Sequence, residues 1–398
     1  MSSENLLSQQ LEDRFTLPVY TNIRLPLTLV RGVGTTVYDD RGNGYLDLYG
    51  GHAVCSIGHS HPRWVEAMIG QIAKLTFYSN ATYCEVRAEA AEILVTHSYA
   101  SMHGVFFCNS GAEANETALK IARKGTGRSQ IVSMTGGFHG RTIGALSVTG
   151  FPKMRDRFPE NIDMFTRFVD FGDPALFDMP DPEKVAAVIL EPIQSVRGVF
   201  MADPEYYRSL RDFCSRNGIV LIFDEVQTGT GRTGQWYAGL HWGVEPDIVT
   251  TAKGVGGGIP AGVVMTSEAV ADTIEPGDQA TTFGGNPVAA AAIRATYQII
   301  EEYGLVEQVR TTSATVIDRL AAIGGVREVR GLGYLLGVEC ELPAKVIQRR
   351  LFDERILVGE CSEPHTIRLL PPLTVSMEEW EQFLDVFEKI VADTSGGH

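Results

Sequence analysis

Two ionisable side chains in the middle of the chain each stand just after an apolar run. Asp224 follows Ile219–Phe223, and Lys253 follows Ile248–Thr251 with one alanine between. Such runs are typical of buried strands, and in open α/β sheets ligands bind beyond the carboxyl ends of the strands. A carboxylate there needs a cationic partner or several hydrogen-bond donors. The pair could therefore bind a ligand. The alternatives are that Asp224 caps a turn, as strand-end aspartates more often do, and that Lys253 is solvated, as most lysines are.

Stretches of small residues accompany this pair. Lys253 is followed by Gly254-Val255-Gly256-Gly257-Gly258, which lets backbone and ligand approach closely. The stretch lacks the third glycine of a dinucleotide fingerprint, and no Walker phosphate loop is present. Asn109-Ser110-Gly111-Ala112-Glu113 lies between an apolar run and a helix-like segment, where backbone N–H groups and the helix dipole favour an anion. The same stretch would serve equally well as an ordinary helix N-cap.

A third motif, Phe138-His139-Gly140-Arg141-Thr142, places a guanidinium group three residues after an aromatic ring. Arginine is suited to bidentate capture of a carboxylate. In isolation, a surface loop with a solvated arginine explains the motif better. The motif indicates a ligand site only in combination with the other motifs of the chain.

Length and composition limit what the protein can be. A chain of 398 residues exceeds the size at which one hydrophobic core stops growing, which predicts two lobes. Lys plus Arg total 34 against 49 Asp plus Glu, a formal net charge of −15, which argues against nucleic acid or an anionic membrane as partner. The six cysteines show neither C-x-x-C nor zinc-ligand spacing, so no metal is expected. A polar start and the lack of a long apolar run predict a cytoplasmic protein.

The elements that must position these motifs alternate as in an α/β fold. The large lobe is expected to hold a mostly parallel sheet, and a smaller α+β lobe is expected to follow it. The predicted domains are an N-terminal segment (1–60), a large domain (61–305) and a small C-terminal domain (306–398). Predicted strands of the large lobe are Val105–Cys108, Gln130–Met134, Val185–Leu190, Ile219–Phe223, Ile248–Thr251 and Gly262–Thr266, with helices at Glu113–Lys124, Glu205–Asn217 and Pro287–Tyr303. In the tail, strands are predicted at Val326–Arg330, Tyr334–Glu339 and Thr366–Leu370, and helices at Pro343–Glu354 and Met377–Ala392.

Together the motifs resemble one family, the class III aminotransferases of the acetylornithine/ornithine type, which have the type I pyridoxal-phosphate fold. The likeness runs from about Arg31 to Leu373. Further motifs that carry it, besides those above, are Gly58-His59-Ser60-His61-Pro62, Glu191-Pro192-Ile193-Gln194, Asp224-Glu225-Val226-Gln227, Gly231-Arg232-Thr233-Gly234, Thr282-Phe283-Gly284-Gly285-Asn286-Pro287 and Arg330-Gly331-Leu332-Gly333.

The resemblance implies an enzyme that moves an amino group between an amino acid or amine and a 2-oxo acid, with glutamate and 2-oxoglutarate as the expected couple. Lys253 is expected to form the Schiff base with pyridoxal 5′-phosphate and later to move a proton at the substrate, while Asp224 pairs with the pyridinium nitrogen. A homodimer is also implied. The remaining cofactor contacts implied by the family are Ser110, Gly111 and Ala112 at the phosphate, Thr282 from the neighbouring subunit, Phe138 and Val226 on the two ring faces, and Gln227 at the ring oxygen.

Substrate contacts follow from the same resemblance. Arg141 matches the family residue for the distal carboxylate of glutamate, and Arg368 matches the one for the α-carboxylate; Glu191 belongs to the same expected pocket. At position 196 the family usually has a glutamate that masks this second arginine when an ω-amino substrate enters, whereas this chain has Val196. Arg368 is therefore expected to stay available, which favours α-amino substrates over the δ-amine of acetylornithine.

Two more positions depart from the family pattern. Asn22 stands where a substrate-facing tyrosine is usual, with Tyr20 nearby, and His52 replaces an apolar residue of the acetylornithine enzymes. The alternatives left open are a decarboxylase-transaminase like dialkylglycine decarboxylase, an epimerase or mutase on the same fold, and a protein that keeps the fold only for binding. Intact Lys253 and Asp224 argue against the last.

Overall fold

The structure is a computed structural model that describes residues 3–20, 24–158, 162 and 165–392. Asn22, one of the positions singled out from the sequence, lies outside these residues. In the part of the chain that is described, no helix is both long and apolar enough to cross a membrane.

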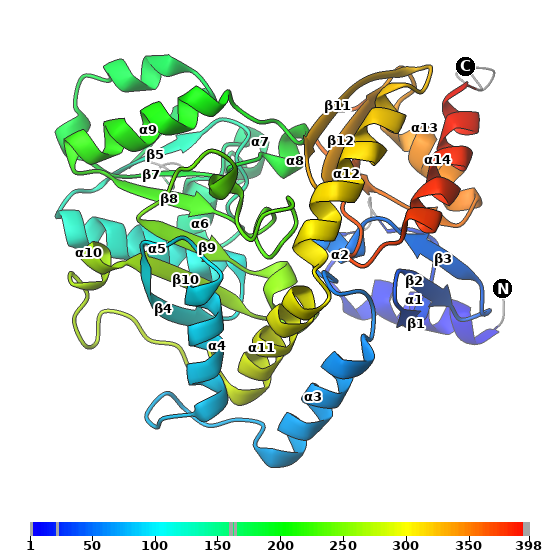
Figure 1. Cartoon of the computed structure of the whole chain (residues 1–398), viewed down its shortest axis with the longest axis horizontal. Helices are drawn as coiled ribbons and strands as arrows, with labels where there is room; N and C mark the ends of the chain where they lie inside the picture. The colour runs from blue at the N-terminus through cyan, green and yellow to red at the C-terminus, as the bar shows by residue number, and fades with distance from the viewer. Residues whose placement is uncertain (1–2, 21–23, 159–161, 163–164, 393–398) are drawn as a thin grey trace.

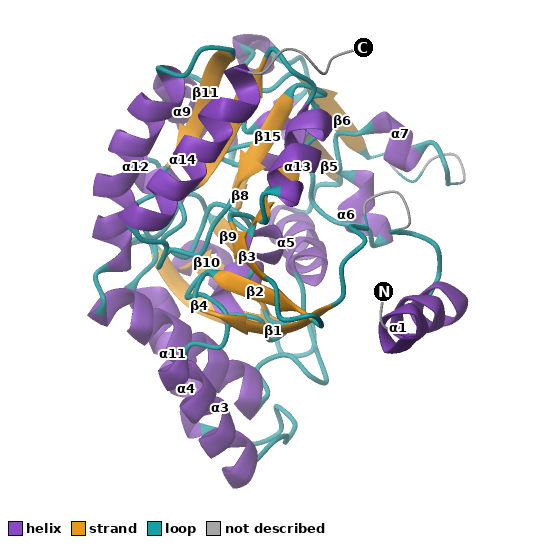
Figure 2. Ribbon diagram, turned by 90° about the vertical axis from the view of Figure 1, so that its right-hand side faces the viewer, coloured by secondary structure: helices purple, strands orange, loops and turns teal. Residues whose placement is uncertain are grey.

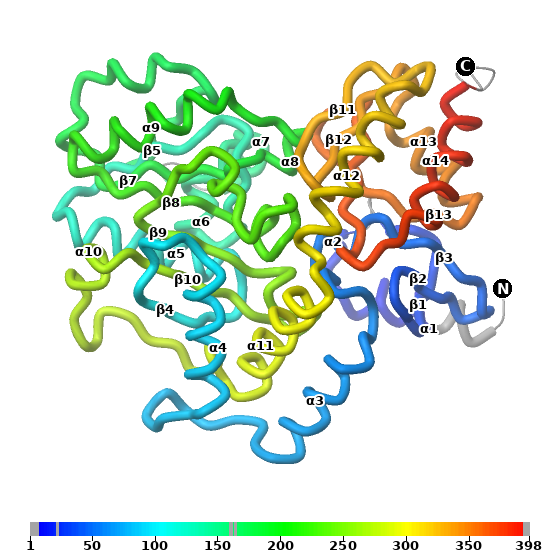
Figure 3. Tube along the Cα trace, in the orientation of Figure 1, coloured from blue at the N-terminus to red at the C-terminus, as the bar shows by residue number. Residues whose placement is uncertain are grey.

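A seven-stranded sheet forms the centre of the larger lobe (Figures 1 and 3). Its parallel run is β9-β8-β7-β5-β6; β10 pairs antiparallel with both β9 and β4, so β4 points the same way as the rest. The expected mostly parallel α/β sheet is confirmed. In spatial order the strands are β4 (Met102–Cys108), β10 (Gly262–Ser267), β9 (Ile248–Thr251), β8 (Val220–Asp224), β7 (Val185–Leu190), β5 (Gln130–Met134) and β6 (Thr166–Val169).

Both faces of this sheet are covered, which explains the unbroken apolar runs of its strands. Along β8, Leu221 and Phe223 belong to one core cluster, whereas Ile222 belongs to another. The first cluster includes residues of α9 (Pro204–Asn217) and α11 (Pro287–Glu302), and the second includes the apolar stripe of α5 (Gly111–Thr126). Helix α5 begins where the Ser110 side chain accepts a hydrogen bond from Glu113 N, and it ends at Gly127, whose φ of 68° is the left-handed conformation that glycine adopts easily.

The smaller lobe is built around a second, antiparallel sheet. Its strands, in spatial order, are β11 (Val326–Leu332), β12 (Leu335–Cys340), β15 (Thr366–Leu369) and β14 (Gly359–Glu360). Helices α12 (Leu305–Ala321), α13 (Ala344–Asp353) and α14 (Met377–Ala392) pack on it, as Figure 2 shows. The N-terminal strands β1 (Leu29–Val33), β2 (Thr36–Asp39) and β3 (Gly44–Asp47) join this side of the molecule, because β3 pairs in parallel with β13 (Ile356–Leu357). The predicted domain boundaries, after residues 60 and 305, stay predictions.

The other helices and turns complete the fold. They are α1 (Ser3–Phe15), α2 (Gly50–Ala53), α3 (Pro62–Lys74), α4 (Glu85–Thr96), α6 (Ile143–Ser147), α7 (Pro152–Arg155), α8 (Ser195–Gly198) and α10 (Glu268–Ala271), with short 3₁₀ turns η1 (Pro174–Asp178), η2 (Pro182–Lys184), η3 (Ala238–His241) and η4 (Lys253–Gly256). Three of them matter for the site: η4 begins with Lys253, α8 carries Ser195, which reaches Arg368 on β15, and α2 follows Tyr49, which also reaches Arg368.

Candidate active site

Lys253 and Asp224 lie at the carboxyl ends of two central strands of the large sheet. Asp224 is the last residue of β8, and Lys253 opens the 3₁₀ turn that follows β9. Since β8 and β9 are parallel neighbours, their carboxyl ends lie side by side. Lys253 has φ 48°, a left-handed conformation that costs a non-glycine residue roughly 1–2 kcal/mol and that is common at functional sites.

The ammonium group of Lys253 sits in an environment that disfavours its charge. Burial is the largest cause and lowers its pKa to about 8; the positive charge of Arg368 adds to this, while Asp224 and Glu191 oppose it. In the described part of the chain no carboxylate lies within ion-pair distance of this amine. Lys253 can therefore present a neutral amine near physiological pH, which a surface lysine cannot.

Asp224 is held by three donors and is only 3% exposed. Its Oδ2 accepts hydrogen bonds from Asn115 Nδ2 at 2.7 Å and from His139 Nδ1 at 2.8 Å, and its Oδ1 accepts one from Val226 N at 3.1 Å. Asn115 is fixed in turn, because its Oδ1 accepts from the Thr250 hydroxyl at 2.7 Å. Such bonds hold a buried carboxylate in one orientation. The turn-cap alternative for Asp224 accounts for only one of the three.

The small residues after β4 pack closely against the segment that follows this carboxylate. A Cβ on Gly111 would lie 2.9 Å from Val226 Cγ2, so only glycine fits between the start of α5 and Val226. Gly140 meets Ala112 in the same way, since its Cβ would come within 2.8 Å of Ala112 Cβ. The expected phosphate cup, one expected ring contact and the Phe138–Thr142 motif therefore adjoin one another.

Glu191, at the end of β7, is tied to the same motif. Its Oε1 accepts a hydrogen bond from Phe138 N at 2.7 Å. Burial and the nearby charge of Asp224 raise the pKa of Glu191 to about 7, although His139 and Lys253 lower it in part. Arg141 is exposed, with its guanidinium carbon 5.5 Å from the centre of the Phe138 ring. Glu191 thus fixes the backbone position of Phe138 through this hydrogen bond.

Arg368 is the second arginine of the expected substrate site, and it is only 5% exposed. Its Nε donates to Glu360 O at 2.6 Å, its Nη1 to Ser195 Oγ at 2.9 Å and its Nη2 to Tyr49 Oη at 3.0 Å. All three acceptors are uncharged, and among the described residues no carboxylate lies within 4 Å of this guanidinium group. A buried positive charge without a counterion favours an anionic ligand.

The expected contacts Gln227 and Val196 are both connected to Arg368 through Ser195, the first by a hydrogen bond and the second as its neighbour in the chain. Ser195, on α8, donates its hydroxyl to Gln227 Oε1 at 3.0 Å, so one serine links the arginine to the ring-oxygen contact expected from the sequence. Val196 is partly buried, and its carbonyl accepts hydrogen bonds from Ser362 N and Oγ at 2.9 and 2.8 Å. The masking position therefore carries no charge.

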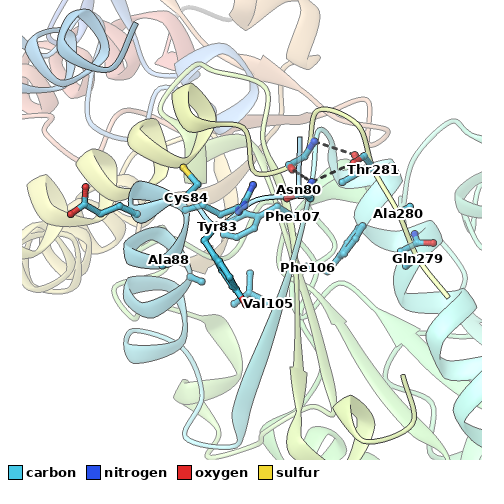
Figure 4. Close-up of a pocket in the computed structure, with 14 residues that line it drawn as sticks. Asn80, Tyr83, Cys84, Ala88, Val105, Phe106, Phe107, Gln279, Ala280 and Thr281 are labelled. Carbon is cyan, nitrogen blue, oxygen red and sulfur yellow. Dashed lines mark hydrogen bonds between the residues drawn. The ribbon is translucent and has the colours of Figure 1, made fainter. Parts of the chain in front are cut away.

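Thr282 lies apart from these side chains, exposed on the loop before α11. Its neighbour Thr281 lines the pocket of Figure 4, between the start of α4 and β4. There Asn80 Nδ2 donates to Thr281 O at 3.3 Å and to Gly284 O at 3.1 Å, and the rings of Tyr83, Phe106 and Phe107 form an apolar wall.

The fold and the site define a class of protein: an α/β enzyme with an amine of lowered pKa, an oriented carboxylate and an arginine without a counterion among the described residues, near the carboxyl ends of its central strands. Comparison with known proteins gives the family. The class-III aminotransferase family model matches residues 19–391, so the chain belongs to the class-III aminotransferases. The pyridoxal-phosphate-dependent transaminase activity expected from the sequence is thereby confirmed, as is the type I fold.

Particular relatives narrow the picture. The chain is 42% identical over 368 residues to the acetylornithine aminotransferase of Methanosarcina mazei, covering 92% of each chain. It is 42% identical over 398 residues to the acetylornithine aminotransferase of Streptomyces coelicolor, covering 98% of each. A crystal structure of the Toxoplasma gondii ornithine aminotransferase, described as having partial occupancy of PLP at its active site, superposes with a TM-score of 0.91 at 28% identity, covering 98% of this chain and 95% of the other. These relatives do not favour the decarboxylase or epimerase alternatives.

Sequence reasoning missed four side chains of this site: Asn115, Ser195, Tyr49 and the partner role of His139. Asn115 had a signal, because it stands four residues after Gly111 on the same helix face. Tyr49 and Ser195 had none, since they meet Arg368 across 319 and 173 positions of the chain.

Proposed function

We propose that this transaminase holds pyridoxal 5′-phosphate on Lys253, with Asp224 at the ring nitrogen and the start of α5 at the phosphate. Several features of the chain fit such a group. The first N–H groups of α5 suit the phosphate charge, and Gly111 lets the start of this helix pack closely against Val226, two residues after Asp224. When bound, the cofactor supplies an electron-withdrawing ring that stabilises negative charge at the substrate's Cα.

The residues of the chain do the rest. Asp224, oriented by hydrogen bonds from Asn115 and His139, is the partner for a protonated ring nitrogen. The amine of Lys253, with its pKa lowered to about 8, accepts and returns the proton at the substrate's Cα. The buried edge of the sheet keeps bulk water away from this proton transfer.

The observation that best supports a carboxylate substrate is that Arg368 has no counterion among the described residues. A guanidinium group has five N–H donors, and three are used by neutral acceptors of the protein. One donor remains on each terminal nitrogen, which is the fork that binds a carboxylate through both oxygens. We propose glutamate and 2-oxoglutarate as one couple, with the α-carboxylate on Arg368 and the distal carboxylate on Arg141.

For the other substrate, the names of the relatives favour acetylornithine, whereas Val196 beside an unmasked Arg368 favours an α-amino acid. The two candidates differ in a measurable way. The α-carboxylate of acetylornithine lies far from its reacting amine. Arg368 would therefore bind the α-carboxylate of glutamate in one half-reaction and would have no carboxylate beside the reacting amine in the other.

We propose that the active unit is a homodimer. Tyr83, which lines the pocket of Figure 4, is fully exposed. Exposed Tyr78 lines a second pocket together with Tyr83, and the exposed rings of Phe77 and Phe283 contact each other. A monomer gains nothing by leaving this cluster in water, whereas a second copy would bury it. Thr282 lies beside the cluster, where it would be able to reach the partner's site. All six cysteines are free, which suits the proposed cytoplasmic location.

The test is a pair of half-reactions with purified protein. Glutamate should bleach the visible absorbance of the bound cofactor, and 2-oxoglutarate should restore it, with acetylornithine and other amines compared at equal concentration. Lys253→Arg is the control, because it keeps a positive charge but has no amine that can form a Schiff base or accept a proton. No bleaching by any amino acid or amine would contradict the proposal, and so would full activity of Lys253→Arg.

A further inference from the structure

His52 stands on an unusual stretch of backbone. Gly50, Gly51, His52 and Ala53 have φ of 55°, 56°, 66° and 65°, which makes α2 a turn of left-handed conformation. Two of the four are not glycine, at a cost of roughly 1–2 kcal/mol each. Within this turn Ala53 N donates to Tyr49 O at 3.0 Å. The turn folds the His52 ring back onto Tyr49, with ring centres 4.6 Å apart.

Tyr49 is the link between His52 and Arg368. Its Oη lies 2.6 Å from His52 Nδ1 and 3.0 Å from Arg368 Nη2. The ring is packed against Gly359, where a Cβ would lie 2.0 Å from Tyr49 Cε2. The position of the phenol is therefore fixed, and only the direction of its hydroxyl proton remains to be set.

The direction of this proton is linked to the tautomer of His52. Arginine only donates, so the Tyr49 oxygen must be the acceptor towards Arg368. The single hydroxyl proton of Tyr49 can then donate to His52 Nδ1, and in this arrangement Nδ1 is unprotonated and the imidazole proton is on Nε2. Partial removal of the ring from water, with the positive charges of Arg368 and Lys253, lowers the pKa of His52 to about 4, in agreement with a neutral ring. Burial also raises the pKa of Tyr49, so its hydroxyl stays protonated.

We propose that His52 is a positioning residue for substrate carboxylates: through Tyr49 it holds Arg368 with one free N–H on each terminal nitrogen. An apolar residue at position 52, as the family pattern has it, would leave the Tyr49 hydroxyl without this acceptor. Its proton then turns towards other partners, and Tyr49 no longer presents a fixed lone pair to Arg368. The inference rests on the proposed function, since it names the residue that sets carboxylate recognition at the same site.

The test compares two substitutions of His52. His52→Asn puts Oδ1 where Nδ1 stands and tolerates a φ of 66°, because asparagine adopts the left-handed region readily. His52→Leu removes the acceptor at similar size. The first readout is the dissociation constant of glutarate, an unreactive dicarboxylate, measured by calorimetry on the holoenzyme. The second is the separation of kcat from KM for glutamate.

His52→Leu is expected to weaken glutarate binding and to raise the KM for glutamate, each about 10-fold, with little change in kcat, which is the size of one lost hydrogen bond to a charged network. His52→Asn is expected to stay close to wild type. In a Tyr49→Phe background His52→Leu should add nothing, since the link is already cut. Glutarate binding unchanged in His52→Leu, an equal loss in His52→Asn, or additive losses in the double variant would each overturn the proposal. A wild-type protein without transamination would instead contradict the proposed function, and the calorimetric comparison would still decide the role of His52.

Discussion

A glutamate at position 196 is expected to convert this site from α-amino towards ω-amino substrates. Val196 follows Ser195, whose hydroxyl lies 2.9 Å from Arg368 Nη1, and the guanidinium group is 5% exposed without a counterion among the described residues. At 4 Å and an effective dielectric constant near 20, an added carboxylate would attract it by about 4 kcal/mol. Taking the carboxylate out of water cancels part of this gain, which leaves about 1.5–3 kcal/mol.

That energy must be overcome whenever a substrate carboxylate displaces the new side chain from the two free donors of Arg368. The KM for glutamate should therefore rise roughly 10- to 100-fold in Val196→Glu. Val196→Gln is the matched control, because it adds the same bulk without charge and should change the KM only slightly. The assay is steady-state kinetics with glutamate and, in parallel, with acetylornithine. An unchanged glutamate KM in Val196→Glu, or an equal rise in Val196→Gln, would refute this reasoning, and a wild type that already prefers acetylornithine would refute its premise.

Three further outcomes are expected. The apoenzyme should capture the cofactor covalently faster as pH rises through about 8 and level off above it, because the lowered pKa of Lys253 sets the fraction of free amine; a midpoint near 10.5 in stopped-flow absorbance would contradict this. Gly111→Ala should weaken cofactor binding at least 10-fold in equilibrium dialysis, because its Cβ would clash with Val226, and adding Val226→Ala should restore much of the loss. Asn115→Ala should lower kcat about 10-fold with the KM for glutamate little changed, because Asp224 loses a donor 2.7 Å away; a change confined to KM would assign Asn115 to substrate binding instead.

The placement of Asp224 and Lys253 was predictable because it follows from local pattern. An apolar run predicts a buried strand, and the carboxyl ends of parallel strands share an edge. The strands at Gln130–Met134, Val185–Leu190 and Ile248–Thr251 have the predicted bounds, and the β4 strand begins three residues earlier than expected, at Met102. The N-terminal strands β1 to β3 were not predicted, because they are short, partly exposed and completed by the two-residue strand β13 from far along the chain.

The surroundings of Arg368 could not be predicted from the sequence, because they too depend on contacts between residues far apart in the chain. Resemblance pointed to the arginine and to the missing charge at Val196, but not to what takes the place of that charge. The answer depends on a serine and a tyrosine brought to the arginine by tertiary packing, and on a left-handed turn that places His52 against the tyrosine. No periodicity in the chain encodes such contacts. His52 was flagged only as a departure from the family pattern.

The central claim, that Lys253 carries the cofactor opposite Asp224, is tested most directly by trapping. Borohydride reduction of the holoenzyme, followed by proteolysis and mass spectrometry of the peptides, locates the lysine that bears the pyridoxyl group. The account predicts the group on the peptide that contains Lys253 alone, and its loss after treatment with glutamate before reduction. A pyridoxyl group on another lysine, or the same labelling with and without glutamate, would contradict it.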